Sequence, residues 1–206
     1  MDTTAPLSPE TWPALPPLPE GEWPAQGQWR YEDYCRLPPV PGRRFEVLFG
    51  ILWTTRAPTV SHQTVVHRLG RELEQHLESG PDGLLRAAPT VVHLPGLAEP
   101  VQPDLLYVRA ERAAIVTDSL VAGPPALVVE VLARRTGRLD RQVKRAAYER
   151  GGVPEYWIAD PRARLIQVYA LEGGAYALAG EYAPGAVLAS RVLPRLALAV
   201  ARVFGR

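Results

Sequence analysis

Two long segments of the chain carry apolar residues at the three-to-four-residue spacing of an amphipathic helix. The first covers residues 61–78, where Ser61 stands at the position expected of an N-cap. Its apolar positions are Val65, Val66, Leu69, Leu73 and Leu77. The second covers residues 138–150 and stops at Gly151-Gly152. A third, shorter helix is predicted over residues 29–36, before a group of prolines.

Strand-like runs lie before, between and after these helices. Residues 43–48 and 51–55 predict a hairpin around Phe49-Gly50. The strands predicted further along are residues 85–94, 104–108, 126–132, 155–159, 165–170 and 175–182. The third of these is almost continuously apolar, which is typical of a strand buried on both faces. We therefore predict an α/β (α+β) fold, with a mixed central sheet flanked by helices and an apolar segment, residues 196–204, packed on it.

The first 28 residues have a different composition. They hold seven prolines, which lock φ and remove backbone donors. We predict a proline-rich extended arm over residues 1–28 and a single domain over residues 29–206. Trp12 and Trp23 lie in this arm. They either pin it to the body or to a partner subunit in a homo-oligomer, or they belong to a mobile tail.

Composition excludes several classes of protein. The chain has 206 residues, of which 47% are apolar, so it can bury a sizeable core. With a net charge of +1, the chain lacks the basic excess of many nucleic-acid-binding proteins. This net charge does not exclude a local basic cleft. Cys35 has no second cysteine to pair with, and four histidines (His62, His67, His76 and His93) show no zinc-ligand spacing. Without a secretory signal or a run of roughly 20 apolar residues, we expect a soluble cytoplasmic protein with no membrane span.

Two carboxylates stand out against the apolar pattern. Asp104 follows Gln102-Pro103 at the start of one strand, and Glu130 lies inside the apolar strand. Strand-borne carboxylates are good ligands for magnesium, which polarises a phosphodiester and activates water. The alternatives are a strand-start or turn aspartate for Asp104 and a solvent-facing position for Glu130. The apolar neighbours of Glu130 argue against exposure, and a buried carboxylate needs a metal ion or a lysine to offset its cost.

The second predicted helix places Asp140, Lys144 and Tyr148 on one face, at i, i+4 and i+8. The Lys144 ammonium can point into the carboxylate site, orient water and stabilise developing charge. The alternative is an ordinary i, i+4 pair with Asp140. Glu46, in another apolar run, is either a third carboxylate of the metal site or the partner of an arginine. His62 either contacts substrate or caps and packs its helix.

Other catalytic patterns are missing from the sequence. It contains no GxSxG, no GxxxxGK[ST] and no HExxH. Cys35 lies between a tyrosine and an arginine near several prolines, with no evident histidine partner. A cysteine nucleophile is therefore not expected.

Five segments together resemble a known family. They are residues 45–50 (Phe-Glu-Val-Leu-Phe-Gly), 61–63 (Ser-His-Gln), 102–105 (Gln-Pro-Asp-Leu), 127–132 (Leu-Val-Val-Glu-Val-Leu) and 140–161. The chain resembles the Uma-type family of bacterial restriction-endonuclease-like proteins over about residues 29–206. The last segment is the most specific, because it is similar in order, spacing and residue type.

The resemblance implies a PD-(D/E)XK nuclease fold, whose core runs helix, three strands, helix, strand. It puts Asp104 and Glu130 at the two metal-binding positions, for magnesium or manganese, and Glu46 near the site. The lysine of this superfamily normally stands two residues after the acid, where this chain has Leu132. In the Uma-type family the lysine of the following helix takes that place, which is Lys144 here.

The resemblance also shows two departures. The family often has an aspartate where Ala126 stands and a serine where Ala133 stands. Neither change removes a proposed metal ligand, but both alter local hydrogen bonding. The predicted function is a metal-dependent endonuclease that hydrolyses DNA phosphodiester bonds. The alternative is a catalytically silent nuclease-fold module that recognises nucleic acid or a protein partner.

Overall fold

The computed structural model of the protein describes residues 7–18, 20–78, 80, 82–134 and 136–205. Its centre is a six-stranded mixed sheet in the order β11-β10-β9-β8-β6-β3. Strands β8 and β9 are parallel, and the other neighbours are antiparallel. The bounds are β3 (Gly83–Ala87), β6 (Leu105–Arg109), β8 (Leu127–Val131), β9 (Glu155–Asp160), β10 (Leu165–Glu172) and β11 (Ala175–Tyr182).

Helices cover both faces of this sheet. Helix α2 (Val60–Glu78) packs on one face together with the C-terminal helix α4 (Val200–Phe204). The other face carries the π-helix η3 (Leu139–Lys144), which continues directly into α3 (Arg145–Arg150). Alternate residues of β6, β8 and β9 enter the two cores, so the central strands are buried on both sides, as their apolar sequences predicted. Along the chain, the elements of this sheet and its helices follow the order α2, then β3, β6 and β8, then η3 with α3, then β9. The expected order of helix, three strands, helix and strand is confirmed for them.

The predicted hairpin forms β1 (Arg43–Leu48) and β2 (Ile51–Arg56), paired from Arg43↔Arg56 to Leu48↔Ile51. Its two-residue loop has positive φ at Phe49 (54°) and Gly50 (72°), which is the twist that a tight hairpin requires. A side chain at Gly50 would lie 2.4 Å from the carbonyl oxygen of Gly27. Glycine is therefore needed here both for its φ and for the close approach of the N-terminal segment.

The single strand predicted over residues 85–94 is wrong. This stretch forms β3, in the six-stranded sheet, and β4 (Val92–Leu94), in a second sheet of order β2-β1-β5-β4-β7. Pro89 lies between them and has no amide hydrogen for a strand ladder. The second sheet also contains two short strands that the pattern did not predict, β5 (Ala98–Val101) and β7 (Val121–Ala122).

The start of α2 also differs from expectation. The helix begins at Val60, and the hydroxyl of Thr59 accepts a hydrogen bond of 3.3 Å from the amide of His62. Thr59 therefore caps the helix, and Ser61 lies inside its first turn. Both residues have the side-chain oxygen that a cap needs, so the sequence alone did not decide between them.

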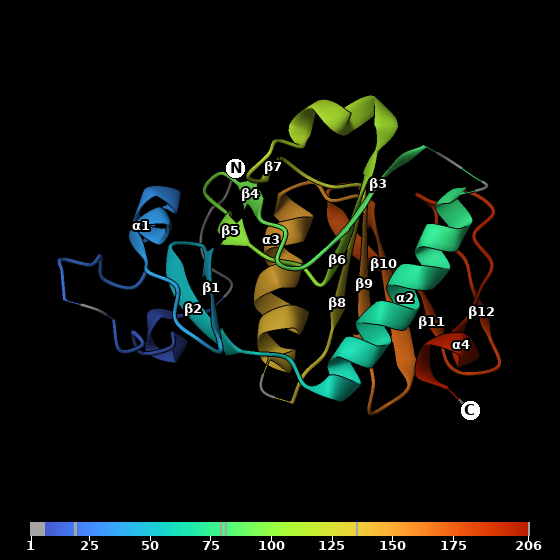
Figure 1. Ribbon diagram of the computed structural model, residues 1–206, viewed down its shortest axis with the longest axis horizontal. Helices are drawn as coiled ribbons and strands as arrows, with labels where there is room; N and C mark the ends of the chain where they lie inside the picture. The colour runs from blue at the N-terminus through green and yellow to red at the C-terminus, as the bar shows by residue number, and fades with distance from the viewer. Residues whose placement is uncertain (1–6, 19, 79, 81, 135, 206) are drawn as a thin grey trace.

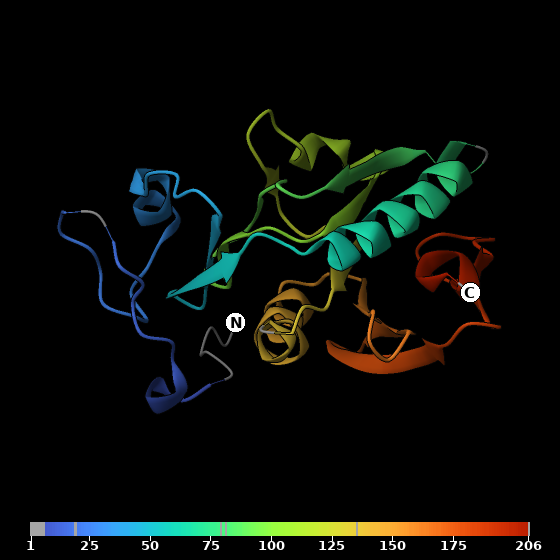
Figure 2. The same cartoon turned by 60° about the horizontal axis from the view of Figure 1, so that its bottom comes forward.

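The C-terminal segment packs on the body as predicted. It forms the two-stranded sheet β12 (Val187–Leu188) and β13 (Leu198–Ala199) and then α4, whose Val200 and Val203 are buried against α2. The remaining short helices are η1 (Pro9–Thr11), α1 (Tyr31–Arg36) and η2 (Ala110–Ile115). Figure 1 shows α1 and the hairpin at one end of the molecule and α4 at the other, and Figure 2 shows the same separation.

The described part of the N-terminal arm lies against the hairpin. Trp23 stacks on Trp29 with 5.7 Å between ring centroids, and the amides of Gly27 and Trp29 donate to the Gly50 carbonyl. The side-chain amide of Gln26 bonds both the N–H and the C=O of Leu52 on the outer strand β2. Trp23 thus pins the arm to its own body. The domain boundary after residue 28 and a contact with a partner subunit stay predictions, and residues 1–6 lie outside the described part.

Within the described residues, no helix combines the length and the apolar character needed to cross a membrane.

A buried carboxylate ties the C-terminal segment to the central sheet. Glu155 on β9 is fully buried and accepts hydrogen bonds from the Trp157 indole (2.7 Å), the Ser190 hydroxyl (2.6 Å) and the Arg191 amide (2.7 Å). Three donors satisfy both of its oxygens by hydrogen bonds, as buried polar groups require.

We predict that Glu155→Gln lowers the free energy of unfolding by roughly 1–3 kcal/mol, because the new amide group would face the Arg191 N–H as a second donor. Chemical denaturation followed by tryptophan fluorescence measures this. The matched control is Glu172→Gln, which removes an exposed carboxylate paired with the side chain of the same Arg191 and should change stability by less than about 1 kcal/mol. Equal stability of wild type and Glu155→Gln would contradict the prediction.

Candidate active site

Strand geometry puts Asp104 and Glu130 on the same face of the central sheet. Side chains two residues apart on a strand share a face. Leu106 and Val128 both enter the core that contains η3 and α3. Asp104 lies two residues before the first, and Glu130 two residues after the second. Both carboxylates are buried, with exposed fractions of 7% and 3%, so the solvent-facing alternative for Glu130 does not apply. Asp104 lies in the bend directly before β6, as the strand-start or turn alternative expected.

Lys144 connects Glu130 to a carboxylate from the second sheet. Its ammonium nitrogen lies 3.0 Å from Glu46 Oε1, 3.1 Å from Glu130 Oε1 and 3.7 Å from Asp140 Oδ1. The structure therefore brings three of the predicted residues, Glu46, Glu130 and Lys144, into direct contact. The i, i+4 contact with Asp140 is also present, so the two placements of Lys144 expected from the sequence occur together, while its role stays a prediction. The ion pair of Glu46 within the described residues is with this lysine rather than with an arginine.

Asp104 is held by its own set of donors. Its Oδ2 accepts a hydrogen bond of 2.8 Å from the amide of Val131, the residue after Glu130, and lies 3.1 Å from Nε2 of His62. The contact with Val131 anchors the Asp104 carboxylate on the strand that bears Glu130. His62 comes from the first turn of α2 and is buried, and its Nδ1 has no hydrogen-bond partner among the described residues. It is a neighbour of the site and not a helix cap.

The helix that carries Lys144 begins as a π-helix, whereas the sequence predicted a regular helix from residue 138. The wider π turn is rare and occurs frequently at functional sites. Two contacts hold Asp140 within it. The Thr136 hydroxyl donates to Asp140 Oδ2 at 2.7 Å, and the Tyr156 hydroxyl donates to the Asp140 carbonyl at 2.9 Å. Apolar spacing does not reveal such a turn, because Tyr156 reaches it from β9.

Two further groups complete the site. The Tyr148 hydroxyl donates to Glu130 Oε1 at 2.8 Å, and the backbone amide of Gln102 donates to Glu46 Oε1 at 2.8 Å. The sequence pointed to the Tyr148 contact, because Tyr148 lies on the same helix face as Asp140 and Lys144. A backbone amide leaves no signal in a sequence, so the second was missed.

The cluster has more negative than positive charge. Four buried carboxyl groups (Glu46, Asp104, Glu130 and Asp140) meet one ammonium group, Lys144. Burial raises the pKa of Glu130 well above its ordinary value, and Lys144 only partly opposes this. Burial also raises the pKa of Asp140, to about 6. Burial by itself would lower the pKa of Lys144, but Glu130, Glu46 and Asp140 together raise it above its ordinary value, so Lys144 stays an ammonium ion.

The donor set suits a hard divalent cation. Lys144 and Tyr148 both contact Oε1 of Glu130, and His62 and Val131 both contact Oδ2 of Asp104. These contacts leave the second oxygen of each carboxylate unused. The described residues contain no group of three or more His, Cys, Asp or Glu side chains that could hold a metal ion. An ion held by Asp104 and Glu130 would thus take its other ligands from water and substrate phosphate, as magnesium commonly does.

Comparison with known proteins identifies the family and the fold of the chain. The family model Uma2, described as "Putative restriction endonuclease", matches residues 31–201. The chain belongs to the Uma2 family. Among solved structures, the chain is similar to "a putative nuclease belonging to DUF820 from Anabaena variabilis ATCC 29413", with a TM-score of 0.69 and 13% identity over 85% of this chain and 97% of that one. A search of curated proteins gives no match.

Family and fold confirm two of the sequence predictions. The resemblance to this family and the restriction-endonuclease-like α+β fold are both shown, with a mixed sheet and helices on its faces. Together they support a nuclease function for the Uma2 protein in general terms. The roles of Asp104, Glu130, Lys144 and Glu46 stay predictions from the sequence and the geometry.

We predict that Asp140 makes the stability of the protein depend on pH. A carboxyl group whose pKa rises from 3.8 to about 6 on folding stabilises the fold fully below pH 3.8. That contribution disappears as the pH rises through about 6, and it amounts to roughly 3 kcal/mol. Because an amide cannot ionise, Asp140→Asn should become more stable relative to wild type between pH 4 and pH 7.5.

Denaturation of both proteins at several pH values measures this difference. The control is Asp160→Asn, a partly exposed aspartate that pairs with Arg141 at 3.0 Å outside the cluster. Unfolding free energies of wild type and Asp140→Asn that run parallel with pH would contradict the prediction.

Proposed function

We propose that this Uma2 protein is a divalent-metal-dependent endonuclease that hydrolyses DNA phosphodiester bonds. The observation that carries the proposal is the contact of the Lys144 ammonium with Glu130 and Glu46, on the sheet face that also bears Asp104. The lysine comes from the helix after the acidic strand rather than from the strand itself. A side chain from η3 reaches Glu130 within 3.1 Å, so the usual strand position of the lysine is not needed.

Each group has a distinct part in the proposed reaction. Hydrolysis adds the oxygen of one water to phosphorus and breaks one P–O ester bond, which gives a phosphate monoester and a free hydroxyl. Asp104 and Glu130 would hold magnesium or manganese, which when bound activates water and neutralises phosphate charge. Lys144 stabilises the negative charge that builds up on the phosphoryl oxygens. Glu46 and Tyr148 position Lys144 and Glu130 through the contacts at 3.0 Å and 2.8 Å.

The surplus of negative charge explains why a cation belongs to this function. A phosphodiester approaching four carboxyl groups and one ammonium would be repelled, because like charges at short range interact unfavourably. A divalent ion reverses that balance at the point where the phosphate must lie. The elevated pKa of Glu130 adds a pH dependence, because the metal competes with a proton for this carboxyl group and binds more tightly as the pH rises.

We predict that magnesium or manganese binds the wild-type protein and that Asp104→Asn and Glu130→Gln each weaken this affinity roughly tenfold or more. Isothermal titration calorimetry at pH 8 measures it. The matched control is Glu155→Gln, which neutralises a buried carboxylate outside the site and should bind the ion as wild type does, provided that it is folded at the temperature used. Equal affinity of all four proteins would place the ion elsewhere and contradict the assignment.

We further predict that Lys144→Met separates metal binding from catalysis. The variant loses the positive charge beside the phosphate, so cleavage of plasmid DNA should fall about 10²–10³-fold. Metal affinity should be equal or higher, since the carboxylates lose a competing cation. The control is Arg141→Gln, which removes a charge from the same helix at an exposed position paired with Asp160 and should keep wild-type cleavage.

A competing function is a catalytically silent binding module. The observation that favours it is that Lys144 contacts three carboxyl groups directly, which offsets part of the buried charge without any ion. The plasmid-cleavage assay on the wild-type protein separates the two functions. Wild-type protein that binds DNA but cleaves no plasmid, supercoiled or linear, with either ion would decide for the silent module.

A further inference from the structure

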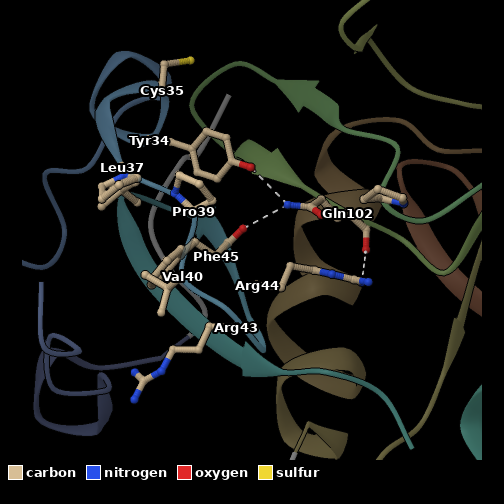
Figure 3. Close-up of a pocket in the computed structure, with 11 residues that line it drawn as sticks. Tyr34, Cys35, Leu37, Pro39, Val40, Arg43, Arg44, Phe45 and Gln102 are labelled. Atoms are coloured by element: carbon tan, nitrogen blue, oxygen red, sulfur yellow. Dashed lines mark hydrogen bonds between the residues drawn. The ribbon is translucent and has the colours of Figure 1, made fainter. Parts of the chain in front are cut away.

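A cavity of about 390 Å³ lies beside the proposed active site, between α1, the chain that leads into β1, and Gln102. This volume falls in the range typical of small-molecule binding sites. Figure 3 shows its walls, with Tyr34 and Pro39 on one side, Val40 and Phe45 below, and Arg44 pointing toward Gln102. None of the predicted catalytic carboxylates lines it.

The lining of the cavity combines two chemistries. Leu37, Pro38, Pro39, Val40 and Phe45 supply apolar surface, and Arg43 and Arg44 supply two guanidinium groups. The described residues that line the cavity include no aspartate or glutamate. In a chain with a net charge of only +1, this is a local excess of positive charge next to a negatively charged cluster. A planar apolar ring with an attached phosphate matches both parts of the lining, since arginine binds phosphate through paired N–H donors.

One buried residue connects the cavity to the catalytic carboxylates. The side-chain amide of Gln102 donates to the Tyr34 hydroxyl (3.1 Å) and to the Phe45 carbonyl (3.2 Å). Its backbone amide donates to Glu46 Oε1 (2.8 Å), which in turn contacts Lys144. The bond from Gln102 uses Tyr34 as an acceptor, so the hydroxyl proton of Tyr34 is not engaged in it. The cavity and the lysine are thus separated by two residues, Gln102 and Glu46.

Strand alternation also aligns the cavity with the site. Arg44 lies two residues before Glu46 on β1, so both side chains leave the same face of the strand. Arg44 donates to the Gln102 carbonyl at 3.5 Å, which holds its guanidinium at the edge of the cavity nearest the site. A nucleic-acid strand with one phosphate at Lys144 would therefore carry its neighbouring nucleotide toward Arg44.

We propose that this cavity binds one nucleotide unit of the substrate strand, next to the phosphate that is cleaved. The base packs on Pro39 and Val40, and the phosphate bonds Arg44. The proposal rests on the proposed nuclease function, because it takes the strand direction from the position of Lys144. It explains how a protein without an overall basic charge holds a nucleic-acid strand.

The test measures binding without cleavage. Thymidine monophosphate is titrated into the full-length protein in the presence of EDTA, and two-dimensional NMR records which amide signals shift. We expect saturable shifts around Tyr34, Val40 and Gln102. Arg44→Gln should weaken binding roughly tenfold, as expected for the loss of a charged hydrogen bond. Val40→Trp, which fills the cavity, should abolish it.

Matched controls and a competitor make the result specific. Arg202 lies on α4, at the opposite end of the molecule, and pairs with Glu72 at 3.1 Å. The variant Arg202→Gln should bind the nucleotide as the wild type does. Short single-stranded oligothymidylate should displace the mononucleotide. If oligothymidylate does not displace the mononucleotide, the cavity takes a free nucleotide, and the proposal that it binds a strand is overturned. Unchanged affinity in both cavity variants would overturn the site itself.

The two proposals fail in different ways. Metal-dependent DNA cleavage by a protein whose cavity binds no nucleotide would overturn the cavity proposal and keep the nuclease. Saturable nucleotide binding that competes with oligothymidylate, in a protein that cleaves no DNA with either ion, would keep the cavity as a nucleic-acid site and overturn the nuclease.

Discussion

The burial of several carboxyl groups around a single lysine is the constraint on which the rest of the structure depends. Each buried carboxylate loses the solvation of water, and breaking a buried ion pair by removing one partner typically costs several kcal/mol. Lys144 lies within 3.1 Å of both Glu46 and Glu130 and so joins two sheets, since β1 and β8 belong to different ones. The hairpin, the central sheet and the π-helix must all be in place for this contact to exist.

The supporting contacts follow from the same constraint. Tyr148 and the amide of Gln102 each donate to a carboxylate oxygen that Lys144 also contacts, and Thr136 donates to Asp140. A carboxylate elsewhere in the protein illustrates the alternative solution. Within the described residues Glu155 has no cationic partner, and three neutral donors satisfy its two oxygens. The site differs because four buried carboxyl groups lie around one ammonium group, that of Lys144.

The proposed substrate binding and the proposed catalysis would occupy neighbouring regions of the protein with opposite charge. The carboxylate cluster would attract a divalent ion but repel a phosphate, whereas the cavity with Arg43 and Arg44 would attract the phosphate. Gln102 separates them and contacts both. Such a division would let a nearly neutral chain act on a polyanion, because local rather than net charge decides where a strand binds.

The sequence by itself determined the main elements and the identity of the central acidic residues. Local periodicity predicted α2, the β1–β2 hairpin and the buried strand β8, because the spacing of apolar residues reports which face of an element is buried. A glutamate in a doubly buried strand predicted that Glu130 needs a cation. What only the tertiary structure decided depends on contacts between segments far apart in the chain. These are the division of residues 85–94 between two sheets, the π turn bonded by Tyr156, the pairing of Glu46 with Lys144 rather than an arginine, and the amide of Gln102 that joins a cavity to the site. Pairings across such separations leave no periodic trace in one sequence, because each half is compatible with many partners until packing brings the two together.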